Sequence, residues 1–326
     1  MKNSKISKLV SWLLKQIDKK QIQIDLSIDQ EIKDGACFER LILPIQELND
    51  IFIIQFFNKH NKHGMVSGLG SDFNQEQAYL KAIVEYFERL AFFNNEQQFN
   101  LKSSNGIASH KVKVLAKNSA IDELIERDAF LIHWYSNSPF VQLELNVQQI
   151  RMNNTLIKKN LELKIGKTYL GLRETTACFL IDHSTGGFAL GLSSGRGSKD
   201  SEKAVLEALI NYFFGNLGQS REEQLQNISN STFSTLTNHR AYWLYKESMP
   251  TWVFDKSGQL SHLNQIRNHR DFECSLIEKS PFFTYLCKND NLLSLNVGLI
   301  SERNIALLTK MGLKVISGST EIHPIP

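Results

Sequence analysis

Apolar and polar positions follow a helical spacing near the start of the chain. Six apolar residues between residues 5 and 20 fall on one helical face, and lysines occupy the other. This periodicity predicts an amphipathic helix. Such a helix could dock on a partner or on a membrane surface, but its commoner role is to pack on its own domain, and we expect that role here. The six residues are Ile6, Leu9, Val10, Leu13, Leu14 and Ile17.

The rest of the chain alternates between strand-like and helix-like segments. β-branched and aromatic residues are concentrated in residues 42–57, 140–145 and 186–192, which predicts strands. Residues 241–246 predict a helix, and the Ser-, Asn- and Gln-rich residues 219–234 predict a loop or an insertion. This alternation predicts an α/β (α+β) class with mixed sheets packed on helices.

An internal repeat is the most informative pattern in the chain. Residues 85–92 (EYFERLAF) and residues 123–130 (ELIERDAF) are identical at five of eight positions. Each copy follows a glycine-containing loop, at residues 68–71 for the first copy and residues 103–106 for the second. The repeat predicts that the chain is built from related strand–helix units.

A third and fainter copy follows the glycine loop at residues 195–198. Its helix carries Ala204 and Ala208 where the first copy has Ala78 and Ala82. This alignment indicates that the third copy has lost both carboxylates of the first. Asn211 stands in place of Glu85, and Phe214 stands in place of Glu88.

Charge and composition exclude several classes of protein. The chain has 37 Lys and Arg against 34 Asp and Glu, and the net charge of +3 is too small to suggest a nucleic-acid partner. Its longest apolar runs, such as residues 130–135, are far shorter than the roughly 18 residues that a membrane span needs. Lysines interrupt the first segment, so no secretory signal forms. We therefore expect a cytoplasmic protein with no membrane partner.

The four cysteines show no metal-binding or redox motif. None belongs to a Cys-x-x-Cys pair, so zinc-knuckle and thioredoxin-like motifs are absent. Catalysis by a lone cysteine with a distant histidine is an alternative, but isolated cysteines are more often small buried residues. We expect the buried role for the four: Cys37, Cys178, Cys274 and Cys287.

Two other patterns have an ordinary structural explanation. His60 and His63 have the spacing of metal ligands, but no carboxylate or cysteine completes a site, so a solvated loop is expected. Trp134 and Tyr135 could stack on a nucleobase, but they lie in an apolar run that is typical of a core.

The repeated Glu-x-x-Glu-Arg segments are the strongest candidates for chemistry. Residues three and four positions apart share one face of a helix, so each copy groups two carboxylates and one guanidinium. A single copy is more often a solvated helix face, but two copies within the same apolar frame favour a site. The candidates are Glu85, Glu88 and Arg89 in the first copy and Glu123, Glu126 and Arg127 in the second.

Four carboxylates brought together would repel one another unless a cation offset their charge. Mg²⁺ suits carboxylate-rich sites because it is a hard cation that retains waters and bridges phosphates. Arginine supplies planar, bidentate contacts to phosphate. The glycine loops would let backbone N–H groups approach phosphate, although neither loop is a Walker A motif. We therefore predict a Mg²⁺–nucleotide between the two related helices.

The ordered motifs together resemble the YcaO family. They run from Gly-x-Gly-Ser through Glu-Tyr-Phe-Glu-Arg, Ser-Asn-Gly and Glu-Leu-Ile-Glu-Arg to the terminal His-Pro-Ile-Pro. The Glu-Tyr-Phe-Glu-Arg segment most resembles the stand-alone subunits of microcin-type thiazole/oxazole synthetases. The resemblance implies a YcaO-like ATP-binding domain at residues 64–326, with residues 1–63 as a helix and strand region packed on it.

The resemblance also assigns roles by position. It implies Mg²⁺ ligands at four glutamates, and ATP contacts at the arginines after them, in the Ser-Asn-Gly loop and at Lys81, where the family often has serine. The proline-rich tail implies a chain terminus near the active site, where a free carboxylate could transfer protons. The implied metal ligands are Glu85, Glu88, Glu123 and Glu126, the implied ATP contacts are Lys81, Arg89, Ser104, Asn105 and Arg127, and the implied catalytic residues are His323 and Pro326.

An activity follows from the same resemblance. Proteins similar to this one phosphorylate a backbone amide of a ribosomally made precursor peptide, and a neighbouring Cys, Ser or Thr then closes a thiazoline or oxazoline ring. We expect such a cyclodehydratase, with a separate subunit that binds the leader of the peptide, because the YcaO-like region fills the chain. An FMN-dependent dehydrogenase subunit and a homodimer within the complex are further expectations.

Two alternatives stay open. The same amide activation could make a thioamide or a macroamidine, although the His-Pro-x-Pro tail favours azolines. The chain could instead be a degenerate, non-catalytic scaffold subunit. Lys81, Leu115 and Asn211 support the scaffold, because the family commonly has other residues at these positions.

Overall fold

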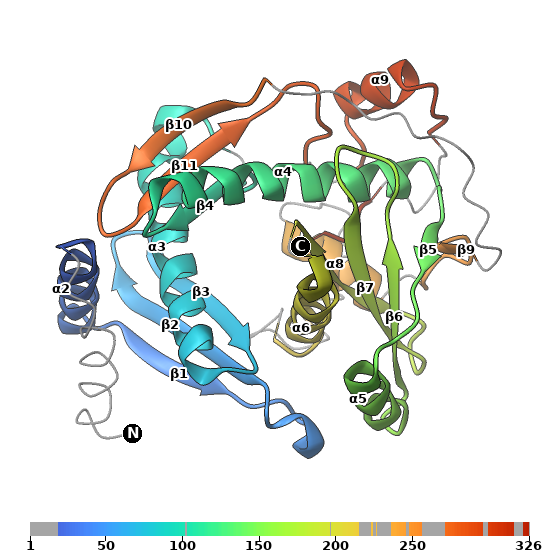
Figure 1. Cartoon of the computed structure of the whole chain (residues 1–326), viewed down its shortest axis with the longest axis horizontal. Helices are drawn as coiled ribbons and strands as arrows, with labels where there is room; N and C mark the ends of the chain where they lie inside the picture. The colour runs from blue at the N-terminus through green and yellow to red at the C-terminus, as the bar shows by residue number, and fades with distance from the viewer. Residues whose placement is uncertain are drawn as a thin grey trace. The chain divides into compact units, whose positions relative to one another are not determined.

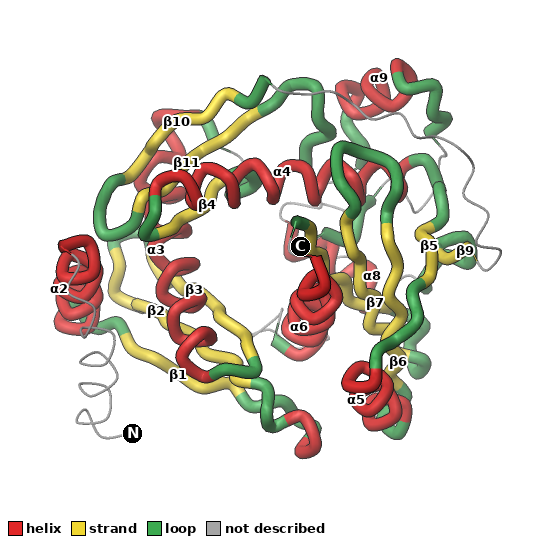
Figure 2. The backbone as a smooth tube through the Cα atoms, viewed as in Figure 1, coloured by secondary structure: helices red, strands yellow, loops and turns green. Residues whose placement is uncertain are grey.

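The computed structural model combines helices with mainly antiparallel strands (Figures 1 and 2). This mixture confirms the predicted α/β (α+β) class. No helix in the described part of the chain is long and apolar enough to cross a membrane. Most of the helix predicted at residues 5–20, most of the polar segment 219–234 and Pro326 lie outside the described residues. The structure describes residues 19–101, 103–195, 197–214, 223, 226, 236–245, 248–255, 271–295, 299–315 and 322–325.

The chain divides into two compact units. Unit 1 comprises residues 1–121 and 272–288, and unit 2 comprises residues 122–271 and 289–326. The long helix α4 (Lys113–Tyr135) begins in unit 1 and continues in unit 2. The two copies of the Glu-x-x-Glu-Arg repeat therefore belong to different units. The division into domains made from the sequence stays a prediction.

Unit 1 contains two three-stranded antiparallel sheets. The first has the strand order β1-β2-β3, and the second has the order β10-β11-β4, so that the second joins distant parts of the sequence. Helices α2 and α3 share a buried apolar cluster with the first sheet. The elements are α2 (Lys19–Lys33), β1 (Cys37–Leu41), η1 (Gln46–Leu48), β2 (Phe52–Asn61), β3 (Gly64–Asp72), α3 (Gln75–Phe99), β4 (Ile107–His110), β10 (Glu273–Glu278) and β11 (Phe283–Lys288).

Small residues allow α3 to lie directly against β3 (Figure 1). A Cβ atom at Gly70 would lie 2.0 Å from the backbone oxygen of Ala78 and 2.4 Å from the backbone nitrogen of Ala82, so a side chain there would collide with the helix. The side chain of Asn74 caps the helix by accepting hydrogen bonds from two backbone N–H groups of the first turn. These contacts fix the position of α3 over the edge of the first sheet.

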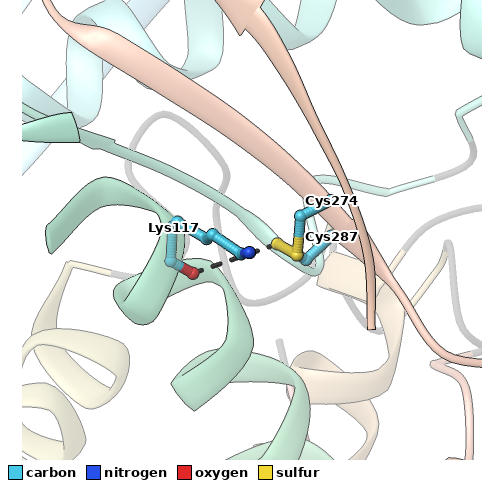
Figure 3. The surroundings of a disulfide bond; sticks show 3 residues. All are labelled: Lys117, Cys274 and Cys287. Carbon is cyan, nitrogen blue, oxygen red and sulfur yellow. Dashed lines mark hydrogen bonds between the residues drawn. A yellow bond between two sulfur atoms is a disulfide. The ribbon is translucent and has the colours of Figure 1, made fainter. Parts of the chain in front are cut away.

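Two cysteines of unit 1 form a disulfide bond (Figure 3). Cys274 in β10 and Cys287 in β11 lie directly opposite each other in the strand register, and the Sγ atom of Cys287 lies 3.9 Å from the backbone oxygen of Lys117. The expectation of an isolated, buried cysteine was wrong for these two positions, because only the hairpin register brings them together. Cys178 is buried as expected, whereas Cys37 is exposed.

Unit 2 is built around a five-stranded sheet with the order β8-β7-β6-β5-β9. Strands β5 and β9 pair in parallel, and the other neighbours pair antiparallel. The strand predicted at residues 140–145 is shorter than expected, and the one predicted at residues 186–192 corresponds to β8. The elements are β5 (Phe140–Gln142), α5 (Val147–Ile157), β6 (Leu161–Lys167), β7 (Thr175–Asp182), β8 (Phe188–Ser194), η2 (Gly197–Lys199), α6 (Asp200–Phe213), α8 (Leu236–Tyr245), β9 (Phe254–Asp255) and α9 (Glu302–Lys310).

Aromatic residues of α4 form the centre of the core of unit 2. Trp134 and Tyr135 are almost completely buried, which confirms that they belong to the core. The indole N–H groups of Trp134 and Trp243 both donate to the backbone oxygen of Ile322, at 3.2 and 2.9 Å. Ile322 and Ile325 are buried in the same cluster. The described part of the C-terminal tail is therefore an integral part of this core.

Candidate functional site

The first Glu-Arg pair of the repeat lies on α3 in unit 1. The Oε2 atom of Glu85 accepts a hydrogen bond from the backbone N–H of Leu69 in β3, at 3.2 Å. The Oε1 atom accepts two bonds from Arg89, from Nε at 3.0 Å and from Nη2 at 2.7 Å. The side chains of Arg89 and Glu85 are 53% and 32% exposed. The pair is therefore held by the protein but remains accessible to a ligand.

Glu88, the second carboxylate of this copy, contacts the other sheet of unit 1. Its Oε2 atom accepts a hydrogen bond from the backbone N–H of Ser109 in β4 at 3.0 Å. The hydroxyl of Ser109 lies 2.7 Å from that of Thr284 in β11. Glu85 and Glu88 thus connect α3 to both sheets. The metal role of both glutamates stays a prediction.

Lys81 lies one helical turn before Glu85 and is held at the end of β3. Its Nζ atom donates to the backbone oxygen of Ser71 at 2.8 Å and to Oδ2 of Asp72 at 2.6 Å. The side chain is 40% exposed. A contact between Lys81 and ATP, as the sequence predicts, would compete with these two bonds.

The predicted Ser-Asn-Gly loop forms a turn immediately before β4. The backbone N–H of Ile107 donates to the backbone oxygen of Ser104 at 2.9 Å, and Gly106 has a φ of 79°, which favours glycine. The Oδ1 atom of Asn105 is buried and has no hydrogen-bond donor among the described residues. Because an unpaired buried acceptor is costly, a donor or a cation from a ligand would stabilise this loop.

The second Glu-Arg pair lies on α4 in unit 2, where Arg127 is only 14% exposed. Its Nη2 atom is 3.9 Å from Oε1 of Glu123, and its Nη1 atom is 4.0 Å from Oε1 of Glu207. These distances exceed the ~3.2 Å limit of a usual N–H···O hydrogen bond. In the part of the chain that the structure describes, Nε and Nη1 have no acceptor. Two nitrogens of the guanidinium can therefore donate to a ligand.

Helix α6 adds a lysine and a third glutamate to this group. The Nζ atom of Lys203 lies 3.8 Å from Oε2 of Glu126, which is only 5% exposed. The Oε2 atom of Glu207 accepts a hydrogen bond from the backbone N–H of Leu192 in β8 at 3.1 Å. We refer to these five residues as the α4–α6 charge cluster: Glu123, Glu126, Arg127, Lys203 and Glu207.

Burial and neighbouring charges shift the ionisation of this cluster. Burial alone would lower the pKa of Arg127, but the carboxylates of Glu207, Glu126 and Glu123 raise it above its ordinary value. Burial raises the pKa of Glu207, although the charges of Arg127 and Lys203 oppose the shift. The guanidinium is therefore firmly charged, and an additional cation would stabilise the ionised form of Glu207.

The chemistry of the α4–α6 charge cluster fits a Mg²⁺–nucleotide. Carboxylate oxygens suit Mg²⁺, and a guanidinium with unpaired N–H groups suits phosphate. Among the described residues, no three His, Cys, Asp or Glu side chains are close enough together to hold a metal ion. A Mg²⁺ ion at this cluster would thus be held by one or two carboxylates, with waters and phosphate oxygens completing its coordination.

The structure brings predicted residues together within each unit. Glu85 and Arg89 are in contact within unit 1, while Glu123 and Arg127 are neighbours within unit 2. The convergence of both glutamate pairs on a single nucleotide stays a prediction.

Two members of the cluster, Lys203 and Glu207, are absent from the candidates chosen by sequence. The alignment of the third copy compares only Asn211 and Phe214 with the glutamates of the first copy. Glu207 lies one turn earlier and supplies a carboxylate at a different position of the helix. The available signal was the Lys-x-x-x-Glu spacing after a glycine loop, which places both charges on one helix face.

His323, a predicted catalytic residue, is fully buried in unit 2. Its backbone oxygen accepts a hydrogen bond from Nδ1 of His239 at 3.1 Å, and the centres of the two rings lie 4.6 Å apart. Burial lowers the pKa of His239 to about 4, although the bond to His323 opposes the shift. Catalytic roles for His323 and for Pro326, which lies outside the described residues, stay predictions.

The sequence of residues 93–278 matches the profile of a known family, described as YcaO cyclodehydratases that bind ATP and Mg²⁺. The match covers more than half of the chain, and the chain therefore belongs to the YcaO family. Its cofactors are accordingly ATP and Mg²⁺, which agrees with the chemistry of the α4–α6 charge cluster. A search of curated proteins found no match.

Several solved structures are similar to this chain at low sequence identity. A heterocyclase in complex with its substrate and cofactor is 11% identical, with a TM-score of 0.56, over 89% of this chain and 54% of that protein. YcaO from Methanopyrus kandleri, bound with AMPPCP and Mg²⁺, is 13% identical, with a TM-score of 0.49, over 65% of this chain and 73% of that one. The microcin synthetase McbBCD complex of E. coli contains a chain that is 12% identical, with a TM-score of 0.46, over 78% of this chain and 86% of that one. The chain thus spans about half the length of the heterocyclase, whose likeness shows the common fold.

Proposed function

We propose that the chain is an ATP- and Mg²⁺-dependent cyclodehydratase that converts Cys, Ser or Thr residues of a ribosomally made precursor peptide into thiazolines or oxazolines. Membership of the YcaO family supports the general class of reaction. The observation that carries the proposal is the buried guanidinium of Arg127. Among the described residues, it has N–H groups without acceptors and carboxylates on two sides. This is the combination of charges that phosphoryl transfer needs.

Four residues of the α4–α6 charge cluster have roles in this proposal. ATP supplies the phosphoryl group that turns an amide oxygen into a leaving group. Arg127 donates N–H bonds to phosphate oxygens, and Lys203 adds a second positive charge. Glu123 and Glu126 hold Mg²⁺ and keep it oriented. Because these charges are already fixed by the fold, they stabilise the charge that develops during transfer without reorganisation.

We also propose that the chain works in the cytoplasm as part of a synthetase complex. A partner subunit binds the leader of the precursor peptide, and an FMN-dependent dehydrogenase oxidises azolines to azoles. The resemblance of the Glu-Tyr-Phe-Glu-Arg segment to stand-alone synthetase subunits supports this arrangement. The heterocyclase with the same fold was solved with its substrate and cofactor, which supports a heterocycle-forming reaction for this chain.

Phosphate release in the presence of the precursor peptide and the partner subunit tests the proposal. Arg127→Ala should lower turnover about 100-fold, which is the scale for loss of one charge-stabilising donor. Arg127→Lys should recover only part of the rate, because lysine keeps the charge but loses the planar donor geometry. Glu174→Gln, an exposed carboxylate of the same unit, is the control and should leave the rate unchanged. Undiminished turnover of Arg127→Ala, or of a Glu85→Ala/Glu123→Ala double variant, would reject the assigned site.

A non-catalytic scaffold is the second candidate function. It is favoured by the internal pairing of the cations of unit 1, since Lys81 binds Asp72 and Arg89 binds Glu85. Isothermal titration with Mg–ATP separates the two functions. Binding in the micromolar range excludes the scaffold, whereas no binding by the folded complex supports it.

The type of amide activation is decided by the mass of the modified peptide. Ring closure removes one water for each azoline, whereas thioamide formation replaces an oxygen atom with sulfur. Macroamidine formation also removes water, but it joins an amine to the backbone, which fragmentation of the peptide identifies. We expect the mass and the fragments of an azoline.

A further inference from the structure

The loop between β6 and β7, residues 168–174, is attached to α4 next to the α4–α6 charge cluster. The Nε2 atom of His133 accepts hydrogen bonds from the backbone N–H groups of Tyr169 and Leu170, both at 3.2 Å. Its Nδ1 atom lies 3.0 Å from the backbone oxygen of Ser138 and donates to it. Burial also lowers the pKa of His133 to about 4, so the ring stays neutral and keeps this arrangement. The first half of the loop is therefore tightly held.

The second half of the loop is attached at the other end of the same helical face. Gly171 has a φ of 117°, and a Cβ atom there would lie 3.0 Å from the Cβ of Ala129. Arg173 then donates a hydrogen bond from Nη1 to the carboxylate of Asp122. Asp122 comes directly before Glu123 of the charge cluster. The loop thus runs along the segment of α4 that carries the cluster.

A second loop packs against the Arg173–Asp122 pair. A Cβ atom at Gly195, which follows β8, would lie 2.6 Å from Nη1 of Arg173 and 3.5 Å from Oδ2 of Asp122. Gly195 and Gly197 both have left-handed conformations, with φ of 74° and 64°. We refer to Gly195 and Gly197 as the glycine turn. These glycines lie between β8 and α6, the helix that supplies Lys203 and Glu207 to the cluster.

Among the described residues, few contacts constrain the glycine turn. Glycine is the residue with the largest conformational freedom, and the N-cap of α6 makes no side-chain hydrogen bond. A hydrogen bond from Oγ of Ser193 to Oδ1 of Asp200, at 2.8 Å, closes the base of the turn. Between these two anchors, the Arg173–Asp122 pair lies against Gly195, whereas nothing lies within 4 Å of a Cβ atom placed on Gly197.

We propose that Arg173 is a positioning residue for nucleotide binding, whose ion pair with Asp122 holds the glycine turn and thereby the start of α6. The ordered turn fixes the distance between Lys203 on α6 and Glu126 on α4, which is 3.8 Å. Arg173 contributes by ordering the protein before the ligand arrives, not by contact with it. The inference rests on the proposed function, since it assigns ATP and Mg²⁺ to the α4–α6 charge cluster.

Three variants perturb the pair in different ways. Arg173→Ala removes the cation, Asp122→Asn removes the anion with little change of shape, and Gly195→Ala places a methyl group where the guanidinium lies. The matched control is Lys167→Ala, which breaks an ion pair of the same unit, between Lys167 and Glu174 at 3.0 Å. The atoms that lie nearest to a Cβ atom on Gly195 belong to Arg173 and Asp122, not to Lys167.

Hydrogen exchange measures the order of the glycine turn, and calorimetry measures the affinity for the nucleotide. In each of the three variants, the amides of the glycine turn should exchange faster than in the wild-type chain. The dissociation constant for Mg–AMPPCP should rise about three- to fivefold, which is the scale of an exposed ion pair. The double variant Arg173→Ala/Asp122→Asn should bind Mg–AMPPCP no more weakly than either single variant, because both substitutions remove the same interaction. Lys167→Ala should change neither readout.

The two readouts separate failure of this inference from failure of the proposed function. If exchange at the glycine turn is unchanged in Arg173→Ala and Asp122→Asn, or if Lys167→Ala has the same effect, the positioning role is overturned. If the wild-type chain does not bind Mg–AMPPCP, the proposed function fails, and exchange still decides whether the pair orders the turn. Arg173→Lys, which keeps the charge, should preserve much of the order and serves where Arg173→Ala does not fold.

Discussion

The strand–helix pairs β3–α3 of unit 1 and β8–α6 of unit 2 share the same packing. In both, a glycine of an edge strand lies against two alanines of the helix, and a Cβ atom on that glycine would lie 2.0 Å from a backbone oxygen of the helix. The residues are Gly70 with Ala78 and Ala82 in unit 1, and Gly191 with Ala204 and Ala208 in unit 2. The faint third copy of the repeat is thus a true structural copy of the first.

In unit 1, two charged side chains of the helix bond to the backbone of the strand beside this packing. Lys81 donates to the backbone oxygen of Ser71, and Glu85 accepts from the backbone N–H of Leu69. The helix therefore presents a cation first and an anion one turn later to the edge of β3.

In unit 2 the donor and the acceptor are exchanged. Glu207 accepts from the backbone N–H of Leu192, and Asn211, one turn later, donates to the backbone oxygen of Leu190 at 2.8 Å. An edge strand exposes both N–H and C=O groups, so the same helix positions can carry either kind of group. The glycine–alanine contact therefore keeps the packing of helix on strand the same in both pairs, while the charged residues beside it can differ and take part in the site.

Gly70→Ala and Gly191→Ala should have the largest effect on this comparison. The added methyl group meets backbone atoms that cannot rotate away, so each variant should lower the free energy of unfolding by about 3 kcal/mol. Gly64→Ala is the control, because nothing lies within 4 Å of its added Cβ and only its positive φ of 83° is unfavourable; we expect a loss of about 1 kcal/mol. Urea unfolding measures all three. A harmless Gly191→Ala would show that the two pairs do not share one packing.

Acid should destabilise unit 2 more than unit 1, in which burial also lowers the pKa of His110 but less strongly. Burial lowers the pKa of His133 and of His239 to about 4, from an ordinary value of 6.5. The unfolded chain therefore binds protons that the folded chain does not, and stability falls as the pH drops from about 6.5 to about 4, by about 3 kcal/mol for each histidine. Hydrogen exchange, corrected for intrinsic rates, should show that β7 and β8 lose protection first.

A histidine variant and its control make this test specific. His133→Gln keeps one acceptor and one donor in the side chain, so it should reduce the loss of protection in acid. His60→Gln, at an exposed position of unit 1, should leave the acid dependence unchanged. Equal loss of protection in both units of the wild-type chain would contradict the expected difference.

The smallest effect on stability should come from neutralising one glutamate in each strand–helix pair. Glu85→Gln should cost up to about 1 kcal/mol of stability, because it weakens a partly exposed ion pair with Arg89. Glu207→Gln should leave stability unchanged or slightly higher, since burial raises the pKa of Glu207 and its ionised form is therefore unfavourable in the fold. Thermal unfolding measures both, and a larger loss for Glu207→Gln than for Glu85→Gln would contradict this assignment.

Local patterns correctly predicted much of the fold. The strand segments, the repeat and the buried Trp134 and Tyr135 follow from periodicity and composition, which depend on near neighbours in the chain. The order of motifs correctly predicted the YcaO family. The disulfide between Cys274 and Cys287 was not predicted, because it depends on the register of β10 against β11.

The candidate site was predicted only in part for the same reason. Glu123, Glu126 and Arg127 stand out because the repeat marks them. Lys203 and Glu207 belong to a helix that is far away along the chain, and no local pattern shows that α6 approaches α4. The attachment of Arg173 to Asp122 is likewise a contact between distant segments.

The amino-acid sequence by itself determined which helix faces carry charge, which segments pair small residues and which family the motifs define. These properties follow from the fixed spacing of residues along a helix or a strand. Only the tertiary structure decided that a guanidinium lies buried among three carboxylates, and that donors and acceptors are exchanged between the two strand–helix pairs. Burial and partnership depend on the packing of segments from distant parts of the chain, and packing is what converts an ordinary charged helix face into a site.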